Sequence, residues 1–206
     1  KNILPSDLSS YPDQTNLYER LSDFLGIDAS SLLLTPGSDA GLKYIFDTFV
    51  VPGDEVVHLN PTYAMIGVYV DMFGAHSAAI SFKKGLTLDT KELISAVNSR
   101  TKLVLLVNPN QPTGTVLQQD VVKEIAERAK TFGSVFVIDE AYIEFSDEES
   151  SLSMVSDYSN LVVMRTFSKA WGLAGVRLGY LAAQARLINE LKKVKPLLDI
   201  NILAIK

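Results

Sequence analysis

The sequence predicts an α/β domain that is layered around a mostly parallel β-sheet. Short apolar segments with strand character alternate with amphipathic helical segments along the chain. Several of these strands, including 32–34 and 135–138, are apolar at every position. Strands that are apolar on both faces are typical of parallel sheets covered by helices on both sides. The alternation of the two kinds of segment therefore favours a helix-covered parallel sheet.

The first half of the chain is expected to start with an extended, irregular arm over residues 1–14. Apolar residues then recur at helical spacing from Leu17 to Leu25, and Gly26 suits the C-terminal cap of that helix. A second helix is expected to begin with Ser38 as its N-cap. The other elements expected here are strands at 32–34, 55–59 and 75–82 and a helix that opens at 60–62 and ends at Gly74.

The second half continues the same alternation. Asp89 and Glu92 have the spacing of a capping box, which predicts the start of a helix. The other elements expected here are strands at 102–107, 135–138, 161–165 and 176–182 and helices at 119–132 and 185–194. The apolar run 197–205 has no stop signal, and as a helix it would need another surface to cover it. Because the chain also opens without a methionine, we expect it to be a piece of a longer protein.

Composition disfavours several classes of partner. The 206 residues are 47% hydrophobic, which is enough for one large or two small domains. The 19 basic and 24 acidic residues are well mixed and give a net charge of −5, so neither nucleic acid nor an anionic membrane is expected as the main partner. No apolar run reaches the length of a membrane span, and the first residues lack the apolar core of a signal peptide, so we expect a soluble cytoplasmic protein.

A metal site is not expected either. The chain has no cysteine, which excludes a disulfide framework and thiolate ligands. Its two histidines, His58 and His76, do not have the spacing of metal ligands. We interpret His58 as a residue of the strand at 55–59.

Polar segments follow five of the predicted strands. In open parallel sheets, ligands bind beyond the carboxyl ends of the strands. Since these ends meet at one edge, we expect the polar segments to build a single ligand site there. The segments are 36–39, 60–63, 108–114, 139–142 and 166–169.

Segment 162–177 is the strongest candidate for the centre of that site. Its apolar start breaks into a polar turn with Ser168 and Lys169, and Arg177 follows after a glycine-spaced stretch. Lysine is suited to a Schiff base, because burial and neighbouring cations lower the pKa of its amine. Arginine is suited to a phosphate, because its planar fork binds two oxygens. Taken alone, such a pattern more often marks an exposed loop lysine and a surface arginine, and the polar segments elsewhere in the chain are what favour a site here.

Taken together, the motifs resemble the large, cofactor-binding domain of fold-type I pyridoxal-phosphate enzymes of the class I and II aminotransferases, and within them the histidinol-phosphate aminotransferases. The motifs are Leu34-Thr35-Pro36-Gly37-Ser38-Asp39, Asn60-Pro61-Thr62-Tyr63, Asn108-Pro109-Asn110-Gln111-Pro112-Thr113-Gly114, Val137-Ile138-Asp139-Glu140-Ala141-Tyr142 and Arg165-Thr166-Phe167-Ser168-Lys169-Ala170 through Arg177. The resemblance covers residues 11–180. It implies a three-layer α/β/α domain over residues 15–195, preceded by the arm 1–14 and followed by the start of a C-terminal segment at 196–206.

The resemblance implies three catalytic residues. Lys169 would form the internal aldimine with pyridoxal 5′-phosphate and then act as general base and acid. Asp139 would pair with the pyridine nitrogen of the cofactor, which makes the ring an electron sink. Asp139 could instead be an ordinary turn residue at the end of a strand. The apolar run 135–138 before Asp139 favours a partly buried carboxylate that needs a cationic partner. Tyr142 would donate a hydrogen bond to the phenolic oxygen.

The phosphate group of the cofactor would be shared among several elements. Backbone N–H groups of Ser38 and Asp39 open a helix and suit an anion, and the Asp39 side chain itself would be awkward beside a phosphate. Thr166 and Ser168 would contribute hydroxyl groups, and Arg177 would contribute its guanidinium.

The remaining expected cofactor contacts come from three other segments. Tyr63 would stack on the cofactor ring. Without the resemblance, Tyr63 could equally be an ordinary aromatic residue on the face of a helix. Gln111 stands where the family usually has asparagine, and Asn110 would compensate for the longer side chain. Tyr11 resembles a tyrosine that reaches the phosphate of the partner subunit in this family, which implies a homodimer.

The implied activity is transamination between a small-molecule amino donor, histidinol phosphate, and a 2-oxo acid acceptor, 2-oxoglutarate. A pyridoxal-phosphate-dependent decarboxylase or lyase acting on an amino-acid phosphate would use the same Lys169 and Asp139. A non-catalytic fragment that only binds the cofactor is the third possibility. The family's arginine for the substrate carboxylate belongs to a C-terminal domain that this sequence does not contain.

Overall fold

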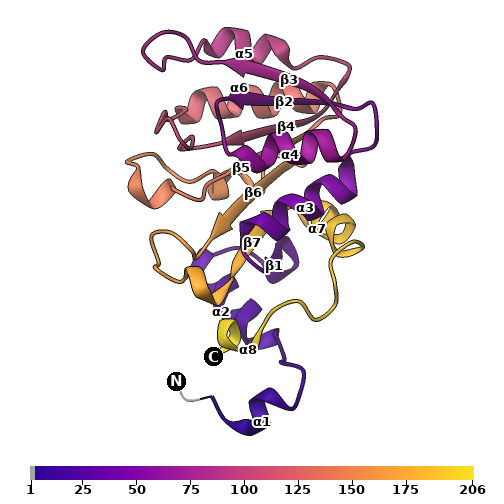
Figure 1. The fold of residues 1–206 in the computed structure, drawn as a ribbon, viewed down its shortest axis with the longest axis vertical. Coiled ribbons are helices and arrows are strands. Elements are labelled where there is room, and N and C mark those ends of the chain that lie inside the picture. The colour runs from indigo at the N-terminus through magenta and orange to yellow at the C-terminus, as the bar shows by residue number, and fades with distance from the viewer. Residues whose placement is uncertain (1–2) are drawn as a thin grey trace.

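The computed structural model describes residues 3–206 and is built around a seven-stranded sheet with the order β1-β7-β6-β5-β4-β2-β3 (Figure 1). The strands are β1 (Leu32–Thr35), β2 (Glu55–Asn60), β3 (His76–Ser81), β4 (Thr101–Val107), β5 (Val135–Asp139), β6 (Leu161–Thr166) and β7 (Gly179–Ala183). Strands β2 to β6 pair in parallel, and β7 is antiparallel to both of its neighbours. The prediction of a mostly parallel sheet is therefore confirmed.

Helices cover both faces of this sheet, which gives three layers. One buried cluster contains residues of α2, α5 and α6, and the other contains residues of α3, α4 and α7. The longer helices are α2 (Thr15–Leu25), α3 (Ser38–Phe49), α4 (Ala64–Met72), α5 (Thr90–Ala96), α6 (Gln119–Thr131) and α7 (Ala185–Lys192). The two single-turn helices are α1 (Pro5–Leu8) and α8 (Ile202–Ile205).

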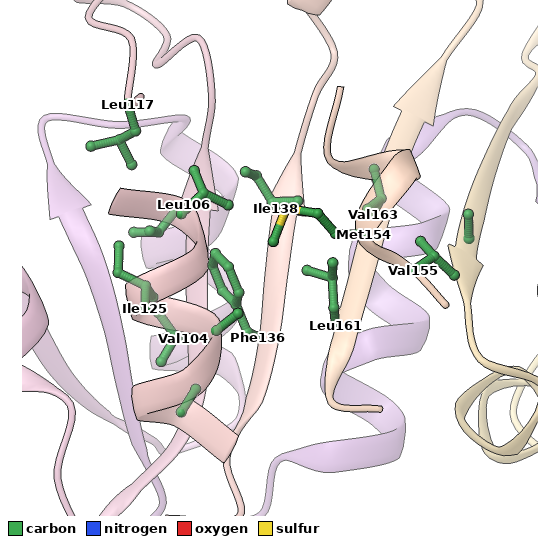
Figure 2. Packing of buried hydrophobic residues seen from close by; sticks show 14 of the residues in the cluster. Val104, Leu106, Leu117, Ile125, Phe136, Ile138, Met154, Val155, Leu161 and Val163 are labelled. Atoms are coloured by element: carbon green, nitrogen blue, oxygen red, sulfur yellow. The ribbon is translucent and has the colours of Figure 1, made fainter. Parts of the chain in front are cut away.

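The central strands are apolar at successive positions because both of their faces are buried. Val104 and Leu106 of β4 point to the α6 side, where they pack with Phe136 and with Ile125 of the helix (Figure 2). The intervening Leu105 belongs to the cluster on the other face. Since side chains alternate across a strand, a sheet covered on both sides leaves only apolar positions in β4 from Leu103 to Val107.

Two helix boundaries show local capping chemistry clearly. Gly26 ends α2 in the left-handed conformation with φ 65°, as predicted. Asp89 caps α5 by accepting hydrogen bonds from the N–H groups of Lys91 and Glu92, both at 3.1 Å. The prediction for α3 was wrong by one residue: Gly37, with φ 79°, is the N-cap, and Ser38 is already helical.

Other boundaries differ from the sequence predictions by a few residues. Helix α4 begins at Ala64, not at the expected opening 60–62, because Tyr63 still has an extended ψ of 119°. The last strand begins at Gly179, since a short 3₁₀ helix at Ala174–Val176 occupies the start of the expected range.

Helices α1 and α8, near the start and the end of the described residues, lie close together beyond β1 (Figure 1). The arm is not wholly irregular: α1 forms there, and its Asp7 pairs with Lys206 at 3.0 Å. Residues 1 and 2 of the predicted arm lie outside the described residues. Near the other end, Ile200 and Ala204 are buried against the core, whereas Leu197 is 85% exposed. The expected apolar helix is thus reduced to one turn, with part of the run packed on the domain itself.

All five polar segments lie at one edge of the sheet. Strands β2, β4, β5 and β6 end there because they are parallel, and β1 ends there because it and β6 are both antiparallel to β7. Strand β7 begins at this edge, where Gly179 pairs with Thr35 on one side and Thr166 on the other. At this edge, the start of β7 is therefore hydrogen-bonded between the ends of β1 and β6.

Gly179 is also the point at which three backbone segments meet. A Cβ atom at this position would lie 2.7 Å from Arg165 O, 2.9 Å from Gly37 C and 2.9 Å from Ser38 N. These neighbours are backbone atoms, so a side chain cannot be accommodated by a change of rotamer. The glycine therefore fixes how closely the start of α3 approaches β6 and β7.

We expect Gly179→Ala to lower the free energy of unfolding by about 1–3 kcal/mol, because the added methyl group overpacks a region of backbone. Urea denaturation of the two proteins measures this loss. Gly175→Ala is the matched control, since a Cβ there meets nothing within 4 Å. Equal losses for the two variants would contradict the proposed steric role of Gly179.

Candidate functional site

A cavity of about 190 Å³ opens at the edge of the sheet where the polar segments meet. Its wall contains residues from the segments that follow β1, β2, β4, β5 and β6. Every residue predicted for the site from the sequence lines this cavity, except Tyr11 and Asn110. The predicted residues in the wall are Ser38, Asp39, Tyr63, Gln111, Asp139, Tyr142, Thr166, Ser168, Lys169 and Arg177.

Lys169 lies in the turn after β6 and faces the segment after β5. Its carbonyl oxygen accepts a hydrogen bond from Gly172 N at 2.9 Å, which closes the turn. Its Nζ atom lies 5.2 Å from the centre of the Tyr142 ring, within the range of a cation–π contact. Among residues 3–206, Lys169 is the one lysine of the cavity wall, and its amine lies over an aromatic ring.

Asp139 ends the central strand β5 and is 4% exposed. Its Oδ1 atom accepts a hydrogen bond from Ala141 N at 3.0 Å. Burial raises the pKa of this carboxyl group to about 7, and the negative charges of Asp39 and Glu140 add to the rise, while Lys169 opposes it. A carboxyl group in this position favours a partner that carries a positive charge or a proton.

The start of α3 and the Arg177 side chain form a cup for an anion. The first N–H groups of a helix have no intrahelical acceptor, and those of Ser38 and Asp39 lie at the cavity. The Arg177 guanidinium lies over Gly37, where a Cβ atom would come within 2.5 Å of Nη2. Its Nη1 atom donates to Ser168 Oγ at 3.2 Å and to Ala174 O at 3.1 Å, so the cation is held in place.

The backbone of the cup is itself unusual. Arg177 has φ 56°, in the left-handed region that disfavours residues other than glycine. The Thr166 hydroxyl group accepts a hydrogen bond from Ser168 N at 3.2 Å, which shapes the turn that leads to Lys169. Both hydroxyl-bearing residues therefore contribute to the loop as well as to the cavity wall.

Tyr63 and Asp39 form a pair on the side of the cavity next to α4. The Tyr63 hydroxyl group donates to Asp39 Oδ1 at 2.5 Å. Burial and the negative charge of Asp39 both raise the pKa of Tyr63, so the phenol stays protonated as the donor. Because the Asp39 carboxylate is engaged with this phenol, its backbone N–H is the group of Asp39 that remains for an anion.

Asn110 stands behind the cavity wall. It is 2% exposed, its Oδ1 accepts from Thr62 Oγ1 at 2.7 Å, and its Nδ2 donates to Pro61 O at 3.0 Å and Thr113 Oγ1 at 2.8 Å. These bonds tie the segment after β4 to the segment after β2. Gln111 is the amide that lines the cavity.

Tyr11 lies away from this cavity. It is 80% exposed and borders a separate groove with Pro12, Tyr18 and Pro196. Within one chain it therefore takes no part in the site.

Val107 and Ala141 also line the cavity and were not predicted from the sequence. Their side chains carry no chemistry of their own, so local sequence gives no reason to select them. Ala141 lies between the predicted site residues Asp139 and Tyr142 in the segment 139–142. Its small size was the one sequence signal that it could line a cavity.

The described residues contain neither a cluster of metal ligands nor a membrane-spanning helix. Between residues 3 and 206, no cluster of three or more histidine, cysteine, aspartate or glutamate residues could hold a metal ion. No helix in the same range is long and apolar enough to cross a membrane. His58 is a buried residue of β2, with Nδ1 at 2.9 Å from Leu59 O and Nε2 at 2.8 Å from Ser77 Oγ.

The fold and this site define a three-layer α/β protein with a lysine, a buried acid and an anion cup in one cavity at the edge of its sheet. Residues 5–198 match the family model for aminotransferase class I and II. The chain therefore belongs to the class I and II aminotransferase family.

Two curated relatives illustrate the range of that family. A histidinol-phosphate aminotransferase of Christiangramia forsetii is 38% identical over 205 residues, which cover 97% of this chain and 58% of the relative. An aromatic amino acid aminotransferase of Corynebacterium jeikeium is 36% identical over 208 residues, which cover 98% of this chain and 55% of the relative. The chain thus spans little more than half the length of these relatives.

Solved structures share the same fold. The histidinol-phosphate aminotransferase of Sinorhizobium meliloti in complex with pyridoxal-5′-phosphate matches with a TM-score of 0.89 at 26% identity, over 98% of this chain and 56% of that one. The L-threonine-O-3-phosphate decarboxylase of Porphyromonas gingivalis matches with a TM-score of 0.82 at 24% identity, over 97% of this chain and 59% of that one. At this identity the second match shows the fold alone.

We expect Asp139→Asn to stabilise the cofactor-free protein above pH 7. The folded pKa of about 7 exceeds the ordinary value of 3.8, so between these two values the unfolded state releases a proton that the folded state keeps. The free energy of unfolding of the parent should therefore fall across that window and level off above it, by at most about 4 kcal/mol. Asparagine cannot ionise and should not show this fall.

Urea denaturation at about pH 4, 6 and 8 measures the effect. Asp147→Asn, which changes an exposed carboxylate, is the matched control. A difference between Asp139→Asn and the parent that is the same at every pH would contradict the assignment of the raised pKa to Asp139.

Proposed function

We propose that this chain is the cofactor-binding part of a pyridoxal-phosphate-dependent aminotransferase. The observation that carries the proposal is the buried Asp139 in the same cavity as Lys169, with the anion cup of Arg177 in the wall. Pyridoxal 5′-phosphate has a ring nitrogen that takes up a proton, an aldehyde that reacts with an amine and a phosphate. These three groups match the acid, the amine and the cup in chemistry.

Each polar residue of the cavity wall has a role in this proposal. The Asp139 carboxylate would pair with the protonated ring nitrogen, and the cation would offset the cost of burying the acid. The N–H groups of Ser38 and Asp39, the hydroxyls of Thr166 and Ser168 and the Arg177 fork would hold the phosphate. Tyr63 would stack on the ring. Gln111 and Tyr142 would hydrogen-bond the phenolic oxygen, and Asn110 would support Gln111 from behind.

The reaction requires a group that moves a proton, and Lys169 is suited to that task. When bound, the cofactor supplies an electron sink for the bond that breaks at the substrate carbon. The Lys169 amine would take the proton from that carbon and return it at a neighbouring atom. The Tyr142 ring, 5.2 Å from Nζ, would keep the amine on the side of the cavity where the proton moves. The Tyr63–Asp39 hydrogen bond would keep Tyr63 in its stacking position.

We propose histidinol phosphate as the amino donor and 2-oxoglutarate as the acceptor. The 38% identity to the histidinol-phosphate aminotransferase of C. forsetii supports this choice. We also propose a cytoplasmic homodimer in which the exposed Tyr11 of the arm reaches the phosphate site of the other subunit. In this view residues 15–195 are the cofactor-binding domain, the arm is 1–14, and 196–206 begin the remaining part of the protein.

The test is a visible absorbance spectrum of the full-length protein incubated with pyridoxal 5′-phosphate, compared with Lys169→Ala. We expect the parent to show the band of a protonated covalent linkage to the cofactor and Lys169→Ala to lack it, because the amine has been removed. Lys84→Ala, which removes an exposed lysine outside the cavity, is the matched control and should keep the band. A folded parent without the band would overturn the proposal.

Product analysis then separates transamination from decarboxylation. With histidinol phosphate and 2-oxoglutarate we expect glutamate and a keto product from the parent and neither from Lys169→Ala. Release of carbon dioxide from an amino-acid phosphate, without glutamate, would instead indicate a decarboxylase that uses the same residues.

We expect Arg177→Lys to weaken binding of pyridoxal 5′-phosphate by about tenfold, or ~1.4 kcal/mol, because a lysine cannot form the two-pronged contact with phosphate. Lysine bears the same left-handed backbone cost as arginine, so the comparison isolates the side chain. Equilibrium titration with pyridoxal 5′-phosphate and with pyridoxal, which lacks the phosphate, measures the effect. An equal loss of affinity for both ligands would show that Arg177 does not bind the phosphate.

A further inference from the structure

A group of side chains outside the cavity joins the segment after β5 to the segment after β6. Glu144 lies in a 3₁₀ turn at Ile143–Phe145, directly after Tyr142. Its Oε1 atom accepts a hydrogen bond from Trp171 Nε1 at 3.3 Å and also pairs with Arg165 Nη2. One carboxylate oxygen therefore contacts two residues that flank Lys169 in the sequence.

Arg165 is a fixed partner for this carboxylate. Its Nη1 atom lies 3.2 Å from Glu140 Oε2 and 3.1 Å from Ser150 Oγ. Glu140 is 1% exposed and is itself held by Ser150 Oγ at 2.5 Å and Ser151 N at 2.6 Å. Because both terminal nitrogens of Arg165 and both carboxylate oxygens of Glu140 are engaged, the guanidinium has little freedom, and Glu144 is attached to a rigid point on β6.

Trp171 connects the same carboxylate to the lysine turn. The hydrogen bond from Gly172 N to Lys169 O encloses Trp171 in the turn that positions Lys169. The indole ring packs against Phe167 with ring centres 5.8 Å apart, on the other side of the lysine in the sequence. A displacement of the indole would therefore move the turn that carries the amine.

We propose that Glu144 is a positioning residue for the cofactor site, which holds the Tyr142 segment and the Lys169 turn at a fixed separation through Arg165 and Trp171. The distance it maintains is the 5.2 Å between Lys169 Nζ and the Tyr142 ring. Glu144 does not line the cavity, so it acts on the reacting groups only through these neighbours. The inference rests on the proposed function, because it assigns Glu144 a part in the same reaction.

Glu144 is the member of the group that can be removed without leaving a buried charge unpaired. Its side chain is 22% exposed, and Arg165 would keep its partner Glu140 in Glu144→Ala. Removal of Arg165 would leave the buried Glu140 carboxylate without its cation, which is strongly destabilising. Removal of Glu140 would leave Ser150 Oγ and Ser151 N without the acceptor that they bind in the interior. Variants of Glu144 and Trp171 therefore test the role on a folded protein.

The kinetic experiment compares Glu144→Ala, Glu144→Gln, Trp171→Phe and the double variant Glu144→Ala/Trp171→Phe in the full-length protein. We expect Glu144→Ala and Trp171→Phe each to lower kcat about tenfold and to change KM for the amino donor by less than about twofold, because the reacting groups are misplaced after the substrate is bound. The double variant should be no slower than Glu144→Ala, since each single variant already removes the contact between Glu144 and Trp171. Glu144→Gln keeps the oxygen acceptor and should recover most of the rate.

Glu148→Ala is the matched control. Glu148 follows Glu144 in the same segment and accepts a hydrogen bond from Gln118 Nε2 at 2.7 Å, but it contacts neither Arg165 nor Trp171. We expect its kcat to equal that of the parent. A control as slow as Glu144→Ala, or additive losses in the double variant, would overturn the positioning role.

A second measurement does not require the cofactor. In protein labelled with fluorotryptophan, the ¹⁹F resonance of Trp171 is the one that disappears in Trp171→Phe. In the cofactor-free protein, Glu144→Ala should shift and sharpen this resonance because the indole gains freedom, and Glu148→Ala should leave it in place. An unchanged resonance in Glu144→Ala would overturn the inference, whereas a parent that never forms the covalent linkage to the cofactor would overturn the proposed function on which it rests.

Discussion

The burial of one acid at the end of a central strand is the constraint on which this site depends. Asp139 is 4% exposed because β5 lies in the middle of a sheet that is covered on both faces. A carboxyl group kept from water is costly when charged unless a cation pairs with it. Its neighbour Glu140 has such a cation in Arg165, but no salt bridge to Asp139 occurs within residues 3–206. The cavity is therefore prepared for a ligand that brings the positive charge.

The anion cup needs a ligand group of the opposite charge, a negative one. There the start of α3 and the Arg177 guanidinium concentrate positive potential at the cavity wall. A ligand with a protonated ring nitrogen and a phosphate satisfies both ends at once. The parallel sheet makes this arrangement possible, because it brings the ends of distant strands to one edge while their apolar bodies supply the core.

Much of this could be predicted from the sequence, because alternating elements and strand-end motifs are local signals. The wall residues from Ser38 to Arg177, apart from Val107 and Ala141, were predicted from strand-end motifs that resemble those of the aminotransferase family. The cap at Gly37 was missed because a serine in the next position is the more usual N-cap. The single turn of α8 was missed because the burial of Ile200 depends on packing against distant residues. The Glu144–Arg165–Trp171 group could not be predicted, since its members lie in separate segments that only the fold brings together.

The close approach at Gly179 makes the geometry of the cup a property of the main chain. The start of α3, the end of β6 and the start of β7 touch through backbone atoms, so the shape of that region does not depend on which side chains project from these strands. Side chains around the site can therefore be replaced while the spacing of the N–H groups at the start of α3 stays the same. The spacing of the peptide groups around the cup therefore depends on Gly179, a residue without a side chain.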